Sequence, residues 1–76
     1  MGKQPTQKYM SYPPPKSTRG GCKVSWNTYE TKAEAAVAAK AAKHNARIDE
    51  ALGYDWGYQC PGYIEKIEGG FEVTLP

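Results

Sequence analysis

The chain has 76 residues, 39% of them hydrophobic, and its ten Lys and Arg against eight Asp and Glu give a net charge of +2. This length allows one small domain. No stretch approaches the roughly 18 consecutive apolar residues of a membrane span. Residues 1–10 also lack the apolar run of a secretory signal, so we expect neither a membrane span nor a signal peptide in this sequence.

The basic charge is concentrated at the start of the chain. Residues 1–29 carry five Lys and Arg and no acid, whereas residues 30–76 carry five basic and eight acidic residues. The first part also contains three consecutive prolines, Pro13–Pro15, and no aliphatic periodicity, which favours an extended conformation over a packed core. We predict a basic, Pro-rich arm over residues 1–20, disordered or extended, followed by a folded domain over residues 21–76.

The predicted domain begins with a strand and a helix. Alternation over residues 22–29 predicts a strand with one buried face made of every second residue: Cys22, Val24, Trp26 and Thr28. Thr31 and Glu34 then have the spacing of a capping box. The alanine-rich run that follows predicts a helix from Lys32 to Leu52, ended by Gly53.

The end of the chain predicts a β-hairpin, residues 63–68 and 71–75, joined at two glycines. A two-residue loop places Ile64 and Lys66 on the face that carries Val73. A three-residue loop with a bulge places the alternate set there instead: Tyr63, Glu65 and Ile67. Both registers remain open. The order β-α-β-β predicts an α+β fold, with one helix packed on a three-stranded antiparallel sheet.

The predicted helix has three distinct stripes at about 100° per residue. The most apolar is the expected sheet-facing side: Val37, Ala41, His44, Ile48 and Leu52. Four alanines lie nearly opposite and are expected to be solvated, or to form a homodimer face: Ala35, Ala39, Ala42 and Ala46. A basic stripe follows one flank at i, i+3 and i+7: Lys40, Lys43 and Arg47.

The sequence contains no recognisable catalytic or metal-binding constellation. Cys22 and Cys60 are the only thiols and His44 is the only histidine, so Cys and His alone cannot supply four zinc ligands. A disulfide between the two cysteines and two reduced thiols both remain open. We expect no enzymatic activity, no metal and no cofactor.

The most unusual segment is residues 53–62, in which three large aromatic residues alternate among glycines: Tyr54, Trp56 and Tyr58. In one interpretation, the rings complete a core that an alanine-rich helix leaves underfilled. In the other, they form an exposed protein-binding platform, because Tyr and Trp dominate interface hot spots. They can also stack on single-stranded bases.

The closing segment Gly70-Phe71-Glu72-Val73-Thr74, the short chain and the polar arm together resemble the small accessory proteins of tailed bacteriophages. The resemblance implies a non-enzymatic protein that binds and inhibits a host complex, or one that decorates the virion. It also implies a cytoplasmic location, in the host if the source is viral.

Three functions follow from these features. The first is a protein-binding inhibitor or adaptor that docks on a host complex through the aromatic segment, the alanine face or a sheet edge. The second is a nucleic-acid-binding protein that combines the basic stripe with Lys16 and Arg19 of the arm. The third is a virion-associated structural protein whose arm lies along a neighbouring subunit.

Overall fold

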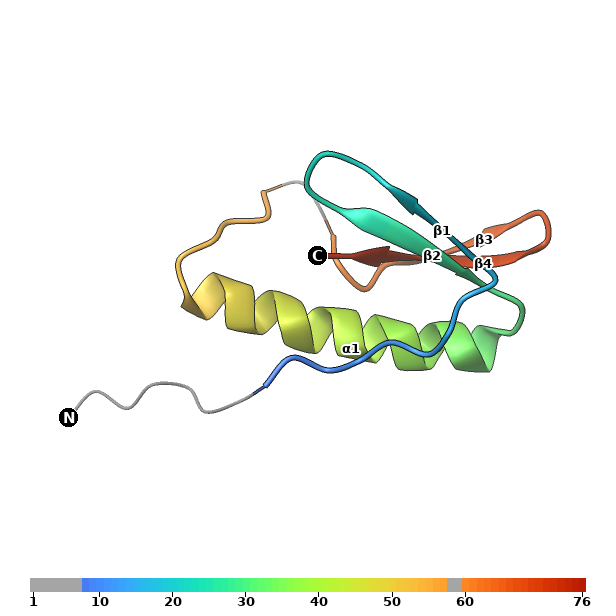
Figure 1. Ribbon diagram of the computed structural model, residues 1–76, viewed down its shortest axis with the longest axis horizontal. Coiled ribbons are helices and arrows are strands. Elements are labelled where there is room, and N and C mark those ends of the chain that lie inside the picture. Colours follow the sequence, from blue (N-terminus) through green and yellow to red (C-terminus); the bar gives the residue numbers. More distant parts are fainter. Residues whose placement is uncertain (1–7, 58–59) are drawn as a thin grey trace.

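The computed structural model describes residues 8–57 and 60–76. Within these residues the chain forms β1 (Ser17–Gly20), β2 (Ser25–Tyr29), α1 (Lys32–Ala51), β3 (Ile64–Ile67) and β4 (Gly70–Leu75). The strands form one antiparallel sheet in the order β1-β2-β4-β3, and α1 lies across one of its faces (Figure 1). The predicted α+β class is confirmed, with four strands in place of three.

The additional strand, β1, comes from the predicted arm. It pairs antiparallel with β2, placing Thr18 opposite Asn27 and Arg19 opposite Trp26. All four residues of β1 are exposed and none is a large apolar residue, so the hydrophobic alternation that identifies strands is missing. The boundary expected after residue 20 therefore falls inside the β1–β2 hairpin.

Residues 8–16, which we call the strap, run beside α1 (Figure 1). The buried side chain of Asn45 holds them, because its Oδ1 accepts from the Met10 amide at 2.7 Å and its Nδ2 donates to the Met10 carbonyl and the Tyr12 hydroxyl. The Tyr29 hydroxyl on β2 donates to the Pro13 carbonyl at 2.8 Å. The strap is thus extended, and it is anchored to both the helix and the sheet.

Both ends of α1 agree with the prediction to within one residue. The Glu34 amide donates to Thr31 Oγ1 at 3.2 Å, which confirms Thr31 as the N-cap, and the Glu34 carboxylate accepts from the Thr31 hydroxyl at 3.2 Å instead of from the Thr31 amide that a full capping box would use. The helix ends at Ala51, and Gly53 takes the left-handed conformation with φ 98°. The signals at both helix ends depend only on residues that are close in sequence, so they do not depend on what packs against the helix.

The helix face that packs on the sheet is not the predicted one. Val37 and Leu52 are 56% and 66% exposed. The alanines expected to be solvated are buried instead: Ala35, Ala39, Ala42 and Ala46. Their small side chains allow close approach, and the sheet supplies the volume through Tyr29, Val73 and Leu75. The prediction of a homodimer through the alanine face is wrong, because the sheet covers that face.

Part of the predicted apolar stripe is buried on another side of the helix. Ala41 and Ile48 are buried and His44 is half-buried. Ala41 and Ile48 lie four residues before and three residues after Asn45, so all three share one flank of α1. The His44 Nε2 donates to the Lys8 carbonyl at 2.8 Å. The buried surface of α1 therefore extends from the sheet round to the strap.

In the second half of β2, the buried residues alternate with those that were predicted to be buried. Asn27 and Tyr29 are buried toward the helix, whereas Trp26 is only half-buried. The buried polar atoms are satisfied, since Thr18 Oγ1 donates to Asn27 Oδ1 at 2.8 Å and Asn27 Nδ2 donates to the Tyr29 hydroxyl at 2.9 Å. A hydrogen-bonded Asn–Tyr pair therefore occupies core positions that the sequence marks as polar.

The β3–β4 hairpin has a two-residue loop at Glu68 and Gly69, one residue earlier than the Gly69–Gly70 loop of the two-residue alternative, and this shift still leaves Ile64 and Lys66 on the Val73 face. Ile64 lies opposite Val73, and Lys66 lies opposite Phe71. Gly69 has φ 91°, which L side chains rarely adopt. These pairings place Ile64 and Lys66 on the helix-facing side of β3, which matters for the groove described below.

Candidate binding surfaces

The aromatic segment begins where α1 ends and returns toward the sheet. Trp56 is only 8% exposed and packs with Val24 and Ala46. Tyr54 is 40% exposed, and its ring meets the Trp56 ring edge-on, with centroids 4.6 Å apart. Tyr58, the third predicted member, lies outside the described residues. Trp56 therefore fills a core position, while Tyr54 remains at the surface.

A pocket of about 250 Å³ lies between this segment and the end of α1. Its lining consists of Asp49, Leu52, Tyr54 and Trp56. Leu52 caps the helix and leaves most of its side chain in solvent, beside the rings of Tyr54 and Trp56 that line the same pocket. We call Leu52, Tyr54 and Trp56 the apolar patch. Leu52 was expected on the sheet-facing stripe, but as the capping residue it does not follow the helical phase of that stripe.

One of the residues that line the pocket carries a buried hydrogen-bond donor. The indole N–H of Trp56 is buried and has no hydrogen-bond partner among residues 8–57 and 60–76. A buried donor without an acceptor costs about 1–3 kcal/mol. Among the described residues, Trp56 is therefore held by packing against Val24, Ala46 and Tyr54, without the hydrogen bond that a buried indole usually finds.

Asp49 places a carboxylate at the rim of the pocket. The Tyr9 hydroxyl of the strap donates to Asp49 Oδ1 at 2.7 Å. This hydrogen bond to a carboxylate raises the pKa of Tyr9 above its ordinary value of 10.0, because the phenolate would lose the bond and face a like charge. The rim therefore presents the carboxyl group of Asp49, bonded to the strap through Oδ1, beside the apolar patch.

The predicted nucleic-acid-binding residues lie on two sides of the molecule. The basic stripe is exposed on α1: Lys40, Lys43 and Arg47. Arg19 instead faces the open side of the sheet, where it donates to the Glu72 carboxylate at 2.9 and 3.1 Å and lies 4.1 Å from the ring centroid of Trp26. Lys16 Nζ donates to the Gly69 carbonyl at 2.9 Å. The arm and the helix stripe thus do not form one basic surface.

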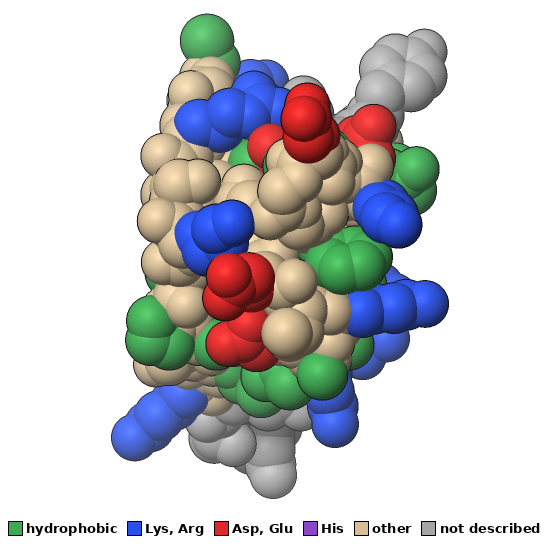
Figure 2. All heavy atoms as spheres, turned by 90° about the vertical axis from the view of Figure 1, so that its right-hand side faces the viewer, with side chains coloured by type: hydrophobic (Ala, Val, Ile, Leu, Met, Phe, Trp, Pro, Cys, Tyr) green, Lys and Arg blue, Asp and Glu red, His purple; other side chains and the backbone are tan. Residues whose placement is uncertain are grey.

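Charges of both signs also mix at one end of the molecule. Figure 2 shows the end that carries the β3–β4 turn and the start of α1, where Lys and Arg side chains lie among Asp and Glu. This face has no extended patch of one sign, unlike the electrostatic footprint of a phosphate-binding surface.

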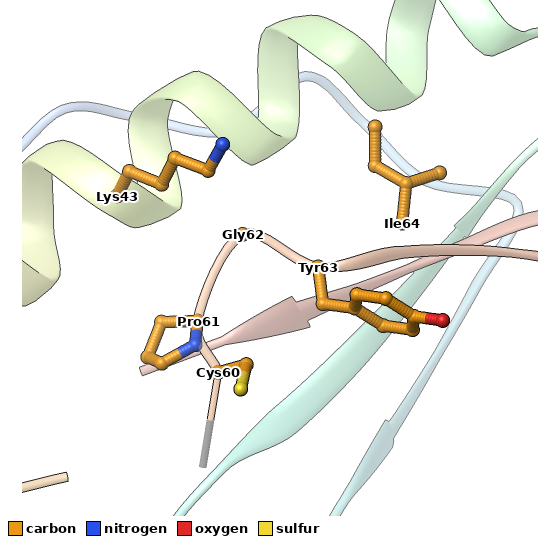
Figure 3. A pocket seen from close by; sticks show the side chains of 6 residues that line it. All are labelled: Lys43, Cys60, Pro61, Gly62, Tyr63 and Ile64. Atoms are coloured by element: carbon orange, nitrogen blue, oxygen red, sulfur yellow. The ribbon is translucent and has the colours of Figure 1, made fainter.

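A second pocket, of about 400 Å³, lies between α1 and the start of β3. We call it the groove, and its lining is Lys43, Cys60, Pro61, Gly62, Tyr63 and Ile64 (Figure 3). Gly62 is buried with φ 89°, and a Cβ there would lie 2.9 Å from the Ala39 carbonyl oxygen. Only a glycine lets the chain pass this close beneath Lys43. Tyr63 is 58% exposed and points away from the helix (Figure 3).

The potential metal ligands of the described residues do not gather at one place, and Cys22 and Cys60 lie at the surface. No three His, Cys, Asp or Glu side chains of residues 8–57 and 60–76 come together as a metal site. Cys22 is an exposed free thiol, and Cys60 is exposed at the groove. Over the same residues, no helix has both the length and the apolar character needed to cross a bilayer.

Comparisons with protein-family models, curated proteins and solved structures found no match to this chain.

Proposed function

We propose that the protein is a small protein-binding module, an inhibitor or adaptor, that docks on its partner through the apolar patch. The observation that carries the proposal is the position of Leu52, which is 66% exposed at the mouth of a pocket lined by Tyr54 and Trp56. Apolar side chains around a concave aromatic surface are typical of interface hot spots. The resemblance to phage accessory proteins supports a host complex as the partner.

The pocket also defines the chemistry of the partner. Its volume of about 250 Å³ fits one or two apolar side chains, and the Asp49 carboxylate at the rim favours a Lys or Arg beside them. If the aromatic segment shifts on binding so that the Trp56 indole N–H reaches the partner, a hydrogen-bond acceptor of the partner would also satisfy this buried donor. We therefore expect a protein surface with a protruding apolar residue next to a basic one.

Two exposed aliphatic residues on the same helix provide a matched test. Leu52→Asp places a charge in the apolar patch, and Val37→Asp makes a comparable change at a side chain that is 56% exposed and lies outside both pockets. Immobilised wild-type protein and both variants are incubated with a bacterial lysate, and the retained proteins are quantified. Binding that is at least about 30-fold weaker for Leu52→Asp alone is expected for a hot spot. Equal retention by the two variants would contradict the proposal.

Nucleic-acid binding is the second candidate, supported by the exposed basic stripe on α1. It is less favoured because Arg19 is paired with Glu72 and Lys16 with a backbone carbonyl, away from that stripe. A salt titration of binding to random DNA separates the candidates, since phosphate contacts give a steep dependence of log K on log salt. The virion-structural alternative is also less favoured, because residues 8–16 lie along the helix of their own chain.

A further inference from the structure

We infer that the outer edge of β3 and the groove beside it form a second binding site, which takes an extended, acidic segment of a partner protein as a fifth strand. This site is separate from the apolar patch and shares none of its lining residues. The inference rests on three features: an open strand edge, an unfilled gap between helix and sheet, and the sign of the charges around that gap.

The outer edge of β3 has unused backbone hydrogen-bonding groups. β3 is the last strand of the sheet, and no described segment pairs with its far side. The Tyr63 carbonyl accepts from the Thr74 amide at 3.0 Å, so residue 63 is directed toward β4. In an antiparallel pair the direction alternates, so the N–H and C=O groups of Ile64 and Lys66 point outward. Such an edge is a template for an added strand.

The groove provides space for the side chains of that strand. Every second residue of an added strand points toward the helix layer, where the volume of about 400 Å³ is bordered by Lys43, Tyr63 and Ile64. The opposite flank of α1 shows that an extended segment fits such a gap, because the strap occupies it there. Lys43 and Asn45 are two residues apart, about 200° around the helix, and so belong to opposite flanks.

The charges around the groove favour an acidic segment. Lys43 borders the groove, and Lys66 lies on the helix-facing side of β3. Arg47 is exposed one turn along the helix from Lys43. Glu65 alternates with Lys66 and so faces the open side of the sheet, away from this gap. Glu or Asp at the helix-facing positions of the added strand would therefore meet basic side chains.

The probe for the test is a ten-residue peptide of alternating Glu and Val, added to the full ¹⁵N-labelled chain and followed by amide chemical shifts. The expected shifts are at Ile64–Ile67, with Ser17–Gly20 unaffected. A peptide of alternating Lys and Val is expected to bind at least about tenfold more weakly. Equal binding of the two peptides, or shifts centred on Ser17–Gly20, would overturn the inference.

Matched variants separate charge from backbone pairing. Lys43→Glu is expected to weaken peptide binding at least about tenfold, whereas Lys23→Glu, the same charge change in the exposed β1–β2 turn, leaves it within about twofold. Lys66→Ala removes one charge, and Lys66→Pro also removes the outward N–H, so the proline variant is expected to bind more weakly than the alanine variant. Amide spectra of the rest of the sheet show whether each variant is folded.

The remaining outcomes identify another occupant or another site. If oligo-dT changes the amide chemical shifts of Ile64–Ile67 more strongly than the acidic peptide does, the site binds nucleic acid, and the inference is overturned. Concentration-dependent shifts of the same amides without peptide would show a second copy of the chain there, with the same consequence. Leu52→Asp is expected to leave peptide binding unchanged; loss of binding in that variant would also overturn the inference, because it would merge the two sites.

Discussion

The two flanks of α1 border the same sheet but are closed in different ways. On one flank, buried Asn45 and Tyr29 hold the strap through four hydrogen bonds, so an extended segment fills the gap between helix and sheet. On the other flank, Lys43 lies over Gly62 and the gap remains an open groove next to an edge strand. Small residues on the helix leave space at both flanks, and among residues 8–57 and 60–76 an extended segment of the chain itself lies at only one of them. The difference indicates that the groove is a place for another chain.

The largest effect is expected from removing the strap. Deletion of residues 1–15 removes every hydrogen bond from the strap to Asn45 and Tyr29 and exposes the flank that carries Ile48. Several hydrogen bonds of about 1 kcal/mol each and the apolar contacts, less the entropy of ordering the segment, amount to about 2–4 kcal/mol. A urea titration measures the unfolding free energy.

Deletion of residues 1–7 is the reference for this experiment, because it leaves all the described strap contacts in place. If the protein without residues 1–15 unfolds at the same urea concentration as the reference, the strap contributes little to the free energy of unfolding. That result would also support the prediction that the arm, residues 1–20, lies outside the folded domain.

A smaller loss is expected on the groove flank from Gly62→Ala. The added methyl would press on the Ala39 carbonyl and the Lys43 side chain, at a φ of +89° that alanine rarely adopts. We expect destabilisation of about 1–3 kcal/mol by thermal or urea unfolding. Gly57→Ala is the matched control, since Gly57 also has positive φ but nothing lies within 4 Å of its Cβ position. Equal losses at the two glycines would mean that conformation alone, and not the close approach to α1, makes Gly62 necessary.

The smallest effect concerns alkaline pH and tests the strap flank alone. Burial raises the pKa of Tyr12 and of Tyr29 above the ordinary value of 10.0. The unfolded chain therefore ionises first, so the stabilisation is complete below about pH 10 and is lost as pH rises through the folded-state pKa values. Unfolding free energies above and below about pH 10 measure the loss. Tyr29→Phe should reduce this loss of stability at high pH, whereas Tyr63→Phe, which changes an exposed ring, should not. The reverse result would show that the loss does not come from the buried tyrosines of the strap flank.

The sequence predicted the features that depend on neighbouring residues. The N-cap at Thr31, the end of the helix just before Gly53 and the hairpin near Gly69 follow from local chemistry, and the structure shows all three. The helix face could not be predicted in this way, because a stripe of alanines carries little hydrophobic signal even when a sheet buries it. Asn27 and Asn45 likewise count as surface residues until their distant partners are known.

The candidate sites were predictable only in part. The sequence identified the aromatic segment, but each interpretation of it applies to a different residue. Trp56 is buried, as expected for core filling, and Tyr54 lies at the surface, as expected for an exposed platform. The basic stripe is exposed as expected, although the structure separates it from Lys16 and Arg19. The groove had no sequence signal of its own, because it depends on how α1 lies relative to the edge of β3.

Native-state hydrogen exchange of three amides tests the contrast between the flanks most directly. The Met10 amide donates to Asn45 at 2.7 Å, whereas those of Ile64 and Lys66 point outward from β3. We predict that the Met10 amide hydrogen exchanges at least about 100-fold more slowly than in an unstructured peptide, and that the amide hydrogens of Ile64 and Lys66 exchange near the unstructured rate. Rapid exchange at Met10 together with protection at Ile64 and Lys66 would contradict it, because the strap flank would then be open and the groove flank closed.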